Sequence, residues 1–555
     1  MPTIKVSISD LERLIGKRLN ADEIKKYLAL LKCEVEKIDG DILEYEANQD
    51  RPDIFSVEGL ARSLRNFMNL PLKQLNFKLS TIKGYAEEIP ERPYIALAIV
   101  KDLVLDDEAV RQIMQLQEKL ATTYGRERRK ASIGVYDLDK VQPPIFYKTM
   151  DPDSSFFTPL NTTRKMSLRD ALTETDQGRL YGKIISNMKR YPVLMDSSGQ
   201  ILSLAPIVNG ESSKVDVSTK NILIDSTSID KDTAVDMVTI MAVNIAERSR
   251  SGTIEAVEVF YPDAEKVVAP RMEKTVMEIN IDDVNSLIGT SISAAETLDL
   301  LKRHYYEAVE IGEKYLRLKI PVFRIDVKSW VDIAEDISIS LGYHNIGSEA
   351  DSLPFSTHPG RIHPIEAFSR KVRDLLLGMS FIEVANYMMS NEQVQLEIFG
   401  LNEKMFTVAN PRSERFTGVR IWLAPGLLET VAENSGKRAM IKIFEIGDVA
   451  IPGDLSNHVQ VERHLGIAIS HDKATLTDGL SVVASMLEHF KVAYKFIKGR
   501  KNGFLEERTS YIEVNDTYVG FVGEVHPAIL HRNRIPHPVV ISEINLSKLI
   551  KLVHH

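Results

Sequence analysis

Apolar residues recur along the chain at two spacings, every second residue and every third or fourth, which predict strands and helices in series. The first part of the chain has three helical patterns, one that starts at a Ser9-Asp10 cap and two at 21–31 and 56–68, and one strand pair at 35–38 and 42–45. A polar stretch at 83–93 contains two prolines and a glycine, which is typical of a linker. We therefore expect an N-terminal α/β domain at 1–88.

Three further regions follow with different patterns. The second has an apolar run at 94–105, an amphipathic helix at 108–124 and many short apolar runs separated by Gly, Pro and Asn, which indicate a β-rich domain. The third mixes helices with strands, and the fourth opens on a helix at 365–377 and continues with strands and loops. The expected domains are 92–268, 271–350 and 355–555. This order of elements indicates an α+β multidomain protein and not one doubly wound sheet.

Composition narrows the function classes. The chain has 555 residues, and 69 Lys and Arg nearly balance 78 Asp and Glu, so a net charge of -9 neither requires nor excludes a polyanionic partner. Cys33 is the only cysteine, which excludes an internal disulfide framework and a cysteine-based zinc cluster. The chain has no apolar signal core and no run of roughly 18 apolar residues. We expect no membrane span and a reducing, cytoplasmic setting.

Four carboxylates lie close together in the segment 324–343. They are Asp326, Asp332, Glu335 and Asp336. If the chain is helical from residue 332, the last three share one face, beside an apolar stripe that begins at Ile333. Like charges at this spacing cost about 0.2–0.5 kcal/mol per pair, and a hard cation with oxygen ligands relieves that repulsion. A solvated acidic first helical turn, favoured by the helix dipole, stays open as the alternative.

Two polar groups in the second region suggest binding. Residues 126–130 hold four basic side chains just before a strand-like run, a patch suited to phosphates, although exposed basic turns are common. A predicted hairpin at 193–204 leads into a loop with a glycine. Asp225 and Thr227 then end a strand, where alternation directs both to one face. A carboxylate beside a hydroxyl fits a polar amino-acid substrate, and an ordinary hydrogen-bonded turn fits equally well.

Several different short motifs follow one another along nearly the whole chain. They are Asn48 to Arg62, Ala131 to Asp139, Ile201 to Glu211, Arg324 to Tyr343, Trp422 to Asn434, Ile443 to Val449 and Gly523 to Pro527. In this combination they resemble the beta subunit of archaeal and eukaryotic phenylalanyl-tRNA synthetase. The resemblance implies an obligate heterotetramer of two alpha and two beta chains, which attaches phenylalanine to its tRNA using ATP.

The same resemblance implies that the alpha subunit carries the aminoacylation site, so that no residue of this chain is catalytic for that step. The C-terminal domain resembles a class II synthetase core, an antiparallel sheet domain, that has lost its catalytic motifs. The sequence agrees, because no Arg follows Phe444 in the strand-like run 443–447, and the region lacks the Gly-rich strand that ends in an ATP-binding Arg. No Gly-rich phosphate loop occurs elsewhere in the chain.

The second region resembles the family's editing domain, of the tRNA-binding B3/B4 type, in which mischarged Tyr-tRNA is hydrolysed. By pattern, Asp225 would accept a hydrogen bond from the phenolic hydroxyl or the ammonium group of tyrosine. The remaining pocket residues would be Leu202, Ser203, Asn209, Gly210, Glu211 and Thr227. The chain departs from many relatives at Ser212, where they carry His. A purely structural, tRNA-binding subunit with an inactive editing pocket is the alternative, and a free-standing RNA-binding protein is a third possibility.

The third region resembles the family's B5-type module, a small winged-helix-like α+β unit with a magnesium site shared with the alpha subunit. The acidic ligands of that site fall on Asp326, Asp332, Glu335 and Asp336. Because magnesium keeps several waters and takes few carboxylates, some of the four are expected to act through water.

Overall fold

The computed structural model describes residues 1–347, 360–452 and 459–553. The chain forms two compact units, Met1–Leu353 and Pro354–His555, and each is described here by itself. The expected boundary between residues 350 and 355 lies outside the described residues.

A three-stranded antiparallel sheet opens the first unit. Its strands run in the order β1-β3-β2, with bounds Thr3–Ser7, Ile42–Glu46 and Glu34–Asp39. Three helices accompany it: α1 (Ile8–Ile15), α2 (Ala21–Leu30) and α3 (Val57–Phe67). Each helix begins after a residue whose side-chain oxygen accepts a backbone N–H of the first turn, namely Ser7, Asn20 and Ser56. The β2–β3 pair and helices α2 and α3 therefore form where the apolar spacing predicted them.

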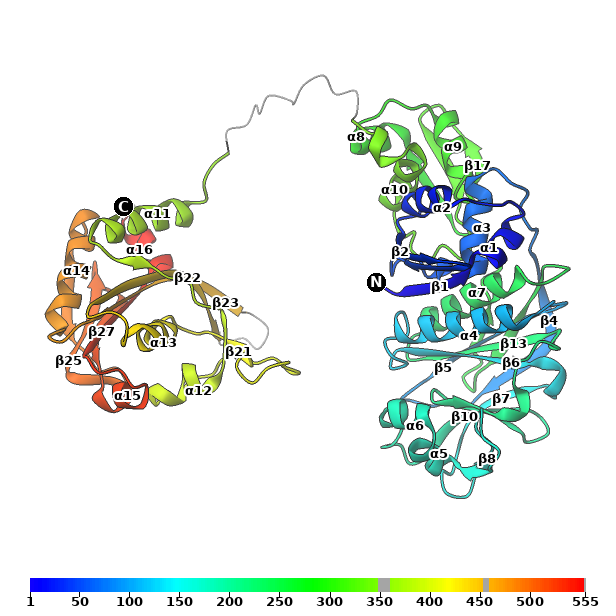
Figure 1. Cartoon of the computed structure of the whole chain (residues 1–555), viewed down its shortest axis with the longest axis horizontal. Helices are drawn as coiled ribbons and strands as arrows, with labels where there is room; N and C mark the ends of the chain where they lie inside the picture. The colour runs from blue at the N-terminus through cyan, green and yellow to red at the C-terminus, as the bar shows by residue number, and fades with distance from the viewer. Residues whose placement is uncertain (348–359, 453–458, 554–555) are drawn as a thin grey trace. The chain divides into compact units, whose positions relative to one another are not determined.

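A ten-stranded mixed sheet forms the centre of the first unit (Figure 1). Nine strands run in the order β12-β11-β10-β7-β4-β14-β5-β13-β6, and β15 pairs with β14. Most neighbours are antiparallel, but β4 runs parallel to both β14 and β7. The bounds are β4 (Asn76–Ala86), β5 (Tyr94–Val100), β6 (Ala131–Asp137), β7 (Ile145–Met150), β10 (Tyr191–Met195), β11 (Ile201–Leu204), β12 (Val208–Asn209), β13 (Ile222–Ser228), β14 (Thr253–Phe260) and β15 (Lys266–Ala269).

Two long helices cover one face of this sheet. Helix α4 (Asp107–Thr122) packs on β6, and α7 (Lys231–Ala246) packs on β5 and β13. Figure 1 shows both in a layer between the large sheet and the N-terminal strands. Since it is enclosed on both sides, α7 is buried along nearly its whole length, as expected of a helix that is apolar all round. Smaller elements pack near β10–β12: β8 (Phe156–Phe157), β9 (Met166–Ser167), α5 (Leu168–Glu174) and α6 (Asp176–Tyr181).

The last part of the first unit is a small α+β module with its own apolar core. Its antiparallel sheet has the order β16-β18-β17, with bounds Val276–Asn280, Tyr315–Lys319 and Glu307–Ile311. Helices α8 (Ile281–Ile288), α9 (Ala294–Lys302) and α10 (Trp330–Leu341) accompany this sheet. Gly289 ends α8 with φ 79°, a left-handed conformation that favours glycine. The winged-helix-like description of the module stays a prediction.

The second unit is built on a seven-stranded sheet of order β19-β22-β23-β27-β26-β25-β24. All its neighbours are antiparallel except β19 and β22. The bounds are β19 (Ile382–Glu383), β22 (Ile441–Pro452), β23 (Val459–Ser470), β24 (Tyr494–Lys498), β25 (Phe504–Val514), β26 (Thr517–Val525) and β27 (Val539–Asn545). This sheet agrees with the antiparallel C-terminal domain expected from the sequence, whose likeness to a synthetase core stays a prediction.

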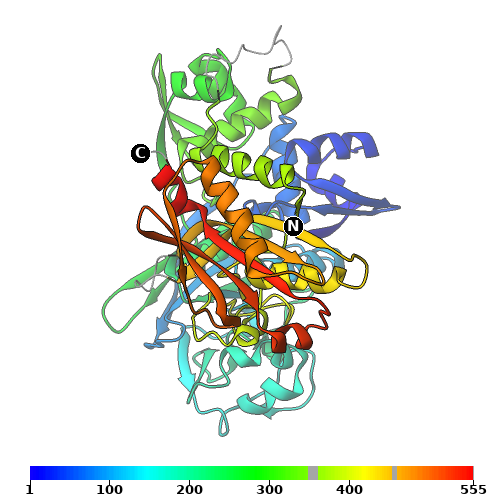
Figure 2. The same ribbon diagram turned by 90° about the vertical axis from the view of Figure 1, so that its left-hand side faces the viewer.

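Helices cover both faces of the second sheet, because its strands alternate between two cores. In β23, Ile467 faces one core and Ala468 the other. Helices α11 (Pro364–Gly378), α14 (Leu476–His489) and α16 (Leu546–Val553) belong to the first core, and α13 (Ala424–Asn434) belongs to the second. Figure 2 shows α14, in orange, lying across the strands of the sheet. Short elements complete the unit: β20 (Met389–Ser390), α12 (Glu392–Gln395), β21 (Gly418–Val419) and α15 (Pro527–Arg532).

The α+β multidomain class is confirmed, and one local prediction is wrong. Residues 83–86, expected to begin a linker, form the end of β4, where Gly84 pairs with Val259 on one side and Ile145 on the other. Many side chains of β4 are exposed and polar, and this composition is also typical of a linker. The division into four domains stays a prediction. In the part of the chain that the structure describes, no helix is long and apolar enough to cross a membrane.

Candidate functional site

A pocket of about 280 Å³ lies beside the C-terminal end of α4 in the first unit. Side chains from α4, β6, β11, β12 and β13 line it, together with the loop that carries Arg128. Three of the residues predicted from the sequence are among them: Ser203, Asn209 and Asp225. Its volume is close to the lower end of the roughly 300–1,000 Å³ typical of small-molecule sites. The pocket therefore has room for one group of amino-acid size.

The other four predicted pocket residues support the wall and do not line it. Leu202 is buried in the apolar core behind β11, and the backbone N–H of Gly210 donates to its carbonyl at 2.7 Å. A carboxylate oxygen of Glu211 accepts the backbone N–H of Asn161, a lining residue, at 2.6 Å. Thr227 is fully buried below the pocket. The predicted common face of Asp225 and Thr227 holds, but only Asp225 reaches the cavity.

Asp225 is the buried charge of this pocket. Only 3% of the residue is exposed, and Oδ1 accepts a hydrogen bond from the Tyr136 hydroxyl at 2.6 Å. Burial raises the pKa of the Asp225 carboxyl to about 6, against the opposing effects of the Tyr136 hydrogen bond and the Arg92 charge. At neutral pH the carboxylate is therefore ionised and, among the described residues, receives a hydrogen bond from Tyr136 alone. It has acceptor capacity left for a ligand.

Two residues that the sequence reasoning missed shape the surroundings of this carboxylate. Arg92 is buried beneath the pocket, where its guanidinium donates to Oγ1 of Thr227 at 2.8 Å and to the carbonyl of Arg128 at 3.0 Å. Burial lowers the pKa of Arg92 to about 10, so it stays charged at neutral pH. Gly134 lies directly opposite Asp225 in the β6–β13 pair, and its missing side chain makes room for the Tyr136–Asp225 contact. Gly134 lies within the motif 131–139, but the spacing of residues in that motif gave no reason to assign the glycine a role.

We expect the Asp225→Asn variant to be more stable than the parent near neutral pH. The carboxyl titrates near 3.8 in the unfolded chain and at about 6 in the fold. The folded state thus binds the proton more tightly, and the free energy of unfolding falls as the pH rises between these values. Asn removes the buried charge, for a gain of up to about 3 kcal/mol near pH 7 that shrinks towards pH 4. Hydrogen exchange of the β13 amides measures it. A gain that does not vary with pH would contradict the assignment.

The acidic segment forms a helix as predicted, but the structure turns two of its carboxylates inward. Asp336 on α10 is buried and accepts hydrogen bonds from the Tyr306 hydroxyl at 2.8 Å and from Arg324. Arg324 also donates to Asp326 at 2.7 Å. One buried guanidinium therefore forms ion pairs with both Asp326 and Asp336. Burial alone would raise the pKa of the Asp336 carboxyl, but the nearby positive charges, Arg324 first, outweigh burial and lower it to about 2.

The other two predicted ligands have separate partners. Asp332 caps the start of α10, where one oxygen accepts the backbone N–H groups of Lys328 and Ser329 at 2.8 and 2.7 Å. Glu335 is partly exposed and forms an ion pair with Lys32 at 2.8 Å. Among the described residues, the four carboxylates do not converge on one point in this structure, and each already bonds to a protein cation or a backbone donor. Their joint role as metal ligands stays a prediction.

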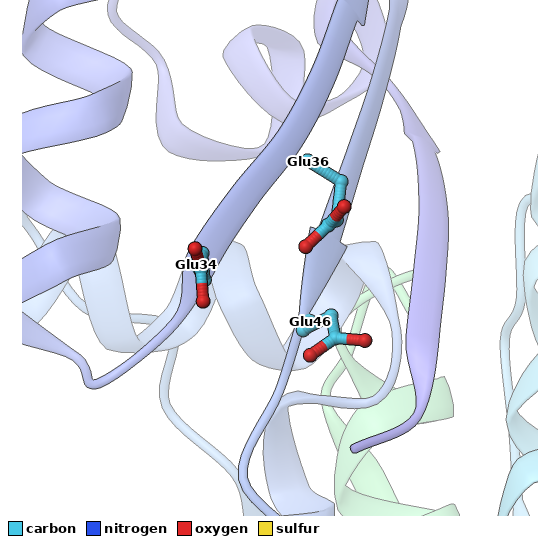
Figure 3. A group of neighbouring side chains, drawn as sticks. All are labelled: Glu34, Glu36 and Glu46. Carbon is cyan, nitrogen blue, oxygen red and sulfur yellow. The ribbon is translucent and has the colours of Figure 1, made fainter.

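A different acidic group does converge. Among the described residues, only Glu34, Glu36 and Glu46 place carboxylates close enough together to share one ion (Figure 3). They lie on the neighbouring strands β2 and β3 near the surface. Exposed acidic groups of this kind are common in proteins that bind no ion at them, and nothing else around these three points to a ligand.

The polar groups of the C-terminal sheet bond chiefly to one another. Glu445 on β22 forms a buried ion pair with Arg420. On the same sheet, Nδ1 of His464 lies 2.7 Å from Glu543, whose carboxylate also accepts the backbone N–H of Ala424 at the start of α13 at 3.0 Å. Burial alone would lower the pKa of His464, but its bonds to Glu462 and Glu543 outweigh burial and raise it to about 9. These groups are satisfied internally and are poorly placed to bind a nucleotide.

Family models match three stretches of the chain. The phenylalanyl tRNA synthetase beta chain CLM domain matches residues 351–546, the tRNA synthetase B5 domain matches 277–343, and the B3/4 domain matches 110–246.

Relatives match almost the entire chain. A phenylalanine–tRNA ligase beta subunit from Thermofilum pendens is 35% identical over 555 residues, which cover 99% of this chain and 98% of the relative. Proteins of the same name from Pyrococcus furiosus and Methanocaldococcus jannaschii are each 33% identical, over 99% and 98% of this chain and 100% of each relative. A crystal structure of an N-terminal fragment of the phenylalanyl-tRNA synthetase beta subunit from Pyrococcus horikoshii matches with TM-score 0.59 and 36% identity, over 62% of this chain and 100% of that fragment.

Proposed function

The chain belongs to the family of phenylalanine–tRNA ligase beta subunits, which are parts of an aminoacyl-tRNA ligase, and from this premise we propose that it removes tyrosine from mischarged tRNA at the Asp225 pocket. The observation that carries the proposal is the buried, ionised carboxylate of Asp225 with acceptor capacity facing a cavity of amino-acid size. The contact that Tyr136 makes with Asp225 is itself a bond from a phenol to a carboxylate, the bond that a tyrosyl substrate would make.

Selectivity against phenylalanine follows from the same carboxylate. A tyrosyl group replaces solvent at Asp225 with its own hydroxyl, whereas a phenylalanyl group leaves the buried charge without that donor. Sites built to hydrogen-bond a substrate reject the analogue that lacks the group far more strongly than apolar pockets do. The lining contains no histidine or cysteine, so a nucleophile–base pair is not part of the proposal. We place the attacking water against backbone groups and the tRNA itself.

The synthetic half-reaction is assigned to the alpha subunit, in a complex of two alpha and two beta chains that uses ATP and Mg²⁺ in the cytoplasm. The proposal is supported by the internal pairing of the C-terminal sheet, where Arg420 is held by Glu445 and not free to bind phosphate. Of the four predicted magnesium ligands, Asp332 and Glu335 are partly exposed and could face a partner chain. No step of the proposed hydrolysis depends on an ion at those residues.

Deacylation by the reconstituted complex tests the pocket. We expect Asp225→Asn to slow hydrolysis of Tyr-tRNA roughly 10²-fold, because the group that orients the substrate is lost. The matched control is Ser226→Ala, a fully buried neighbour on β13 whose hydroxyl contacts Met237 of α7 on the other face of the sheet. The control should hydrolyse Tyr-tRNA like the parent. Aminoacylation with phenylalanine should be unchanged in both variants.

Two results would decide against this reading. Equal hydrolysis by Asp225→Asn and the parent would remove Asp225 from the site. Absence of hydrolysis in the parent complex would favour the second candidate, a structural tRNA-binding subunit with an inactive pocket. Synthesis of phenylalanyl adenylate by the isolated chain would contradict the assignment of that step to the alpha subunit.

A further inference from the structure

Two exposed arginines beside the pocket have no partner of their own. Among the described residues, the guanidinium groups of Arg126 and Arg129 take part in no ion pair and no hydrogen bond. Other exposed arginines of the same region are paired, as Arg164 is with Glu174 and Arg169 with Asp153. Unpaired cations on a protein surface are free to neutralise the charge of a partner.

The backbone of this loop is held in one conformation. Arg126, Glu127 and Arg128 have φ values of 50°, 53° and 66°, a left-handed run that non-glycine residues seldom adopt. Their backbone N–H groups donate to the carbonyls of Thr123, Thr122 and Ala121 at 3.0, 3.1 and 3.0 Å. The last turn of α4 therefore anchors the loop, so its basic side chains start from fixed positions.

The loop lies between two cavities. On its outer side, Arg126, Arg129 and Lys130 line an open hollow of about 830 Å³ with Thr122 and Thr123 at the end of α4. On its inner side, Arg128 lines the Asp225 pocket, donates to the carbonyl of Ile207 at 2.6 Å and keeps a buried Nε without a partner among the described residues. The basic loop thus stands at the boundary between an open surface and the proposed catalytic pocket.

We infer that the loop 125–130 binds the phosphates of an RNA 3′ strand and leads the amino acid esterified to its terminal nucleotide into the pocket. Phosphate is the partner that the chemistry favours, because three cations face the outer hollow against the carboxylates of Glu127 and Asp230. The Asp230 carboxylate is already engaged as the N-cap of α7, where it accepts the backbone N–H of Thr233 at 3.0 Å. It also lies 3.9 Å from Lys130 in an ion pair, so Arg126 and Arg129 are the cations left for phosphate. The hollow of about 830 Å³ has room for a strand that passes over it, while the inner pocket of about 280 Å³ has room only for the esterified amino acid. The direction of the strand rests on the proposed function; binding of phosphates by the loop does not.

Binding of an uncharged RNA hairpin with a single-stranded 3′ end tests the inference on the full chain. The variant Arg126→Gln, Arg129→Gln, Lys130→Gln removes the outer cations and keeps side-chain length. We expect its Kd to rise at least about tenfold near 0.1 M salt, and the slope of log Kd against log salt to fall by about two to three units. The matched control Arg164→Gln, Arg169→Gln, Lys189→Gln removes as many exposed cations and should keep the affinity and slope of the parent.

The salt slope separates direct phosphate contact from a change of fold, because a merely misfolded fraction lowers the amount bound without changing the slope. Equal Kd and slope in the loop variant and the control would overturn the inference. Displacement of the RNA by a mononucleotide at equal phosphate concentration would also overturn it, since the loop would then take single phosphates and not a strand. If the parent complex fails to hydrolyse Tyr-tRNA while loop-dependent binding persists, the proposed function falls, and with it the direction of the strand, whereas binding of phosphates by the loop stands.

Discussion

The Gly134→Ala variant is expected to lose about 1–3 kcal/mol of stability in the β6–β13 pair and, with it, the arrangement of the pocket. An added Cβ would lie closer than 3.0 Å to Oδ1 of Asp225 and to the hydroxyl oxygen of Tyr136, a separation that real Cβ atoms essentially never show. Both atoms end buried side chains, and Gly134 is the direct register partner of Asp225, so both side chains must shift to admit a methyl group. The methyl group must therefore break the hydrogen bond of 2.6 Å between them.

Hydrogen exchange of the β6 and β13 amides and hydrolysis of Tyr-tRNA measure the two effects separately. Gly378→Ala serves as the control, since nothing lies within 4 Å of an added Cβ at the end of α11 and its backbone is not left-handed. That change should be neutral or stabilise the chain by about 0.4–1 kcal/mol. Normal protection of β13 together with normal hydrolysis in Gly134→Ala would contradict the prediction, since the two side chains would then make room for the methyl group without loss of stability. Lost hydrolysis with normal protection would instead place the glycine in the reaction itself.

The sequence predicted residues that line the pocket better than it predicted the residues that support them. Asp225 could be predicted, because a polar residue within an apolar run is a local signal, although it lies in the middle of β13 and not at the strand end that the sequence predicts. Asn209 is assigned to the pocket only by the family resemblance. Tyr136 lies 89 residues from Asp225 along the chain. Arg92 and Gly134 come close to Asp225 only because β13 pairs with β5 on one side and with β6 on the other. Strand order in a sheet of ten strands depends on non-local contacts that spacing does not encode.

The fold shows the same division. Strong helical periodicity predicted α4, α10 and α11 within a few residues of their bounds. The polar strand β4 was mistaken in part for a linker, because its parallel pairing with β14 joins segments far apart in the chain. In the acidic segment the helical spacing was right, but spacing cannot show that Asp336 turns towards Arg324 and that Glu335 finds Lys32 from the N-terminal domain. The neighbouring carboxylates of this segment would repel one another, but in the fold three of them pair with cations that the helical spacing does not reveal.

Replacement of Arg324 by leucine should destabilise the α10 module by about 3–5 kcal/mol, the usual cost of removing one member of a buried ion pair. Its guanidinium is buried and binds both Asp326 and Asp336. In the double variant Arg324→Leu, Asp336→Asn, part of this loss should be recovered, with a coupling energy of about 1–3 kcal/mol between the two sites. Arg317→Leu on β18 is the control, because its partners are exposed and the pair is worth at most about 1 kcal/mol. Hydrogen exchange of the α10 amides measures all three.

The same variants also test magnesium binding, because Mg²⁺ and the Arg324 guanidinium would compete for the same carboxylate oxygens. In the isolated chain, Mg²⁺ should leave the stability of the parent unchanged, since Arg324 already bonds to both Asp326 and Asp336. In Arg324→Leu the two carboxylates are left without that cation, and Mg²⁺ should then stabilise the module as any ligand of the folded state does. Stabilisation of the parent by Mg²⁺ that Asp336→Asn abolishes would show that these carboxylates hold the ion without help from a partner chain. If Mg²⁺ changes the stability of neither the parent nor Arg324→Leu, two explanations are left. Either the ion needs ligands from the partner chain, or the carboxylates serve only in ion pairs within this chain.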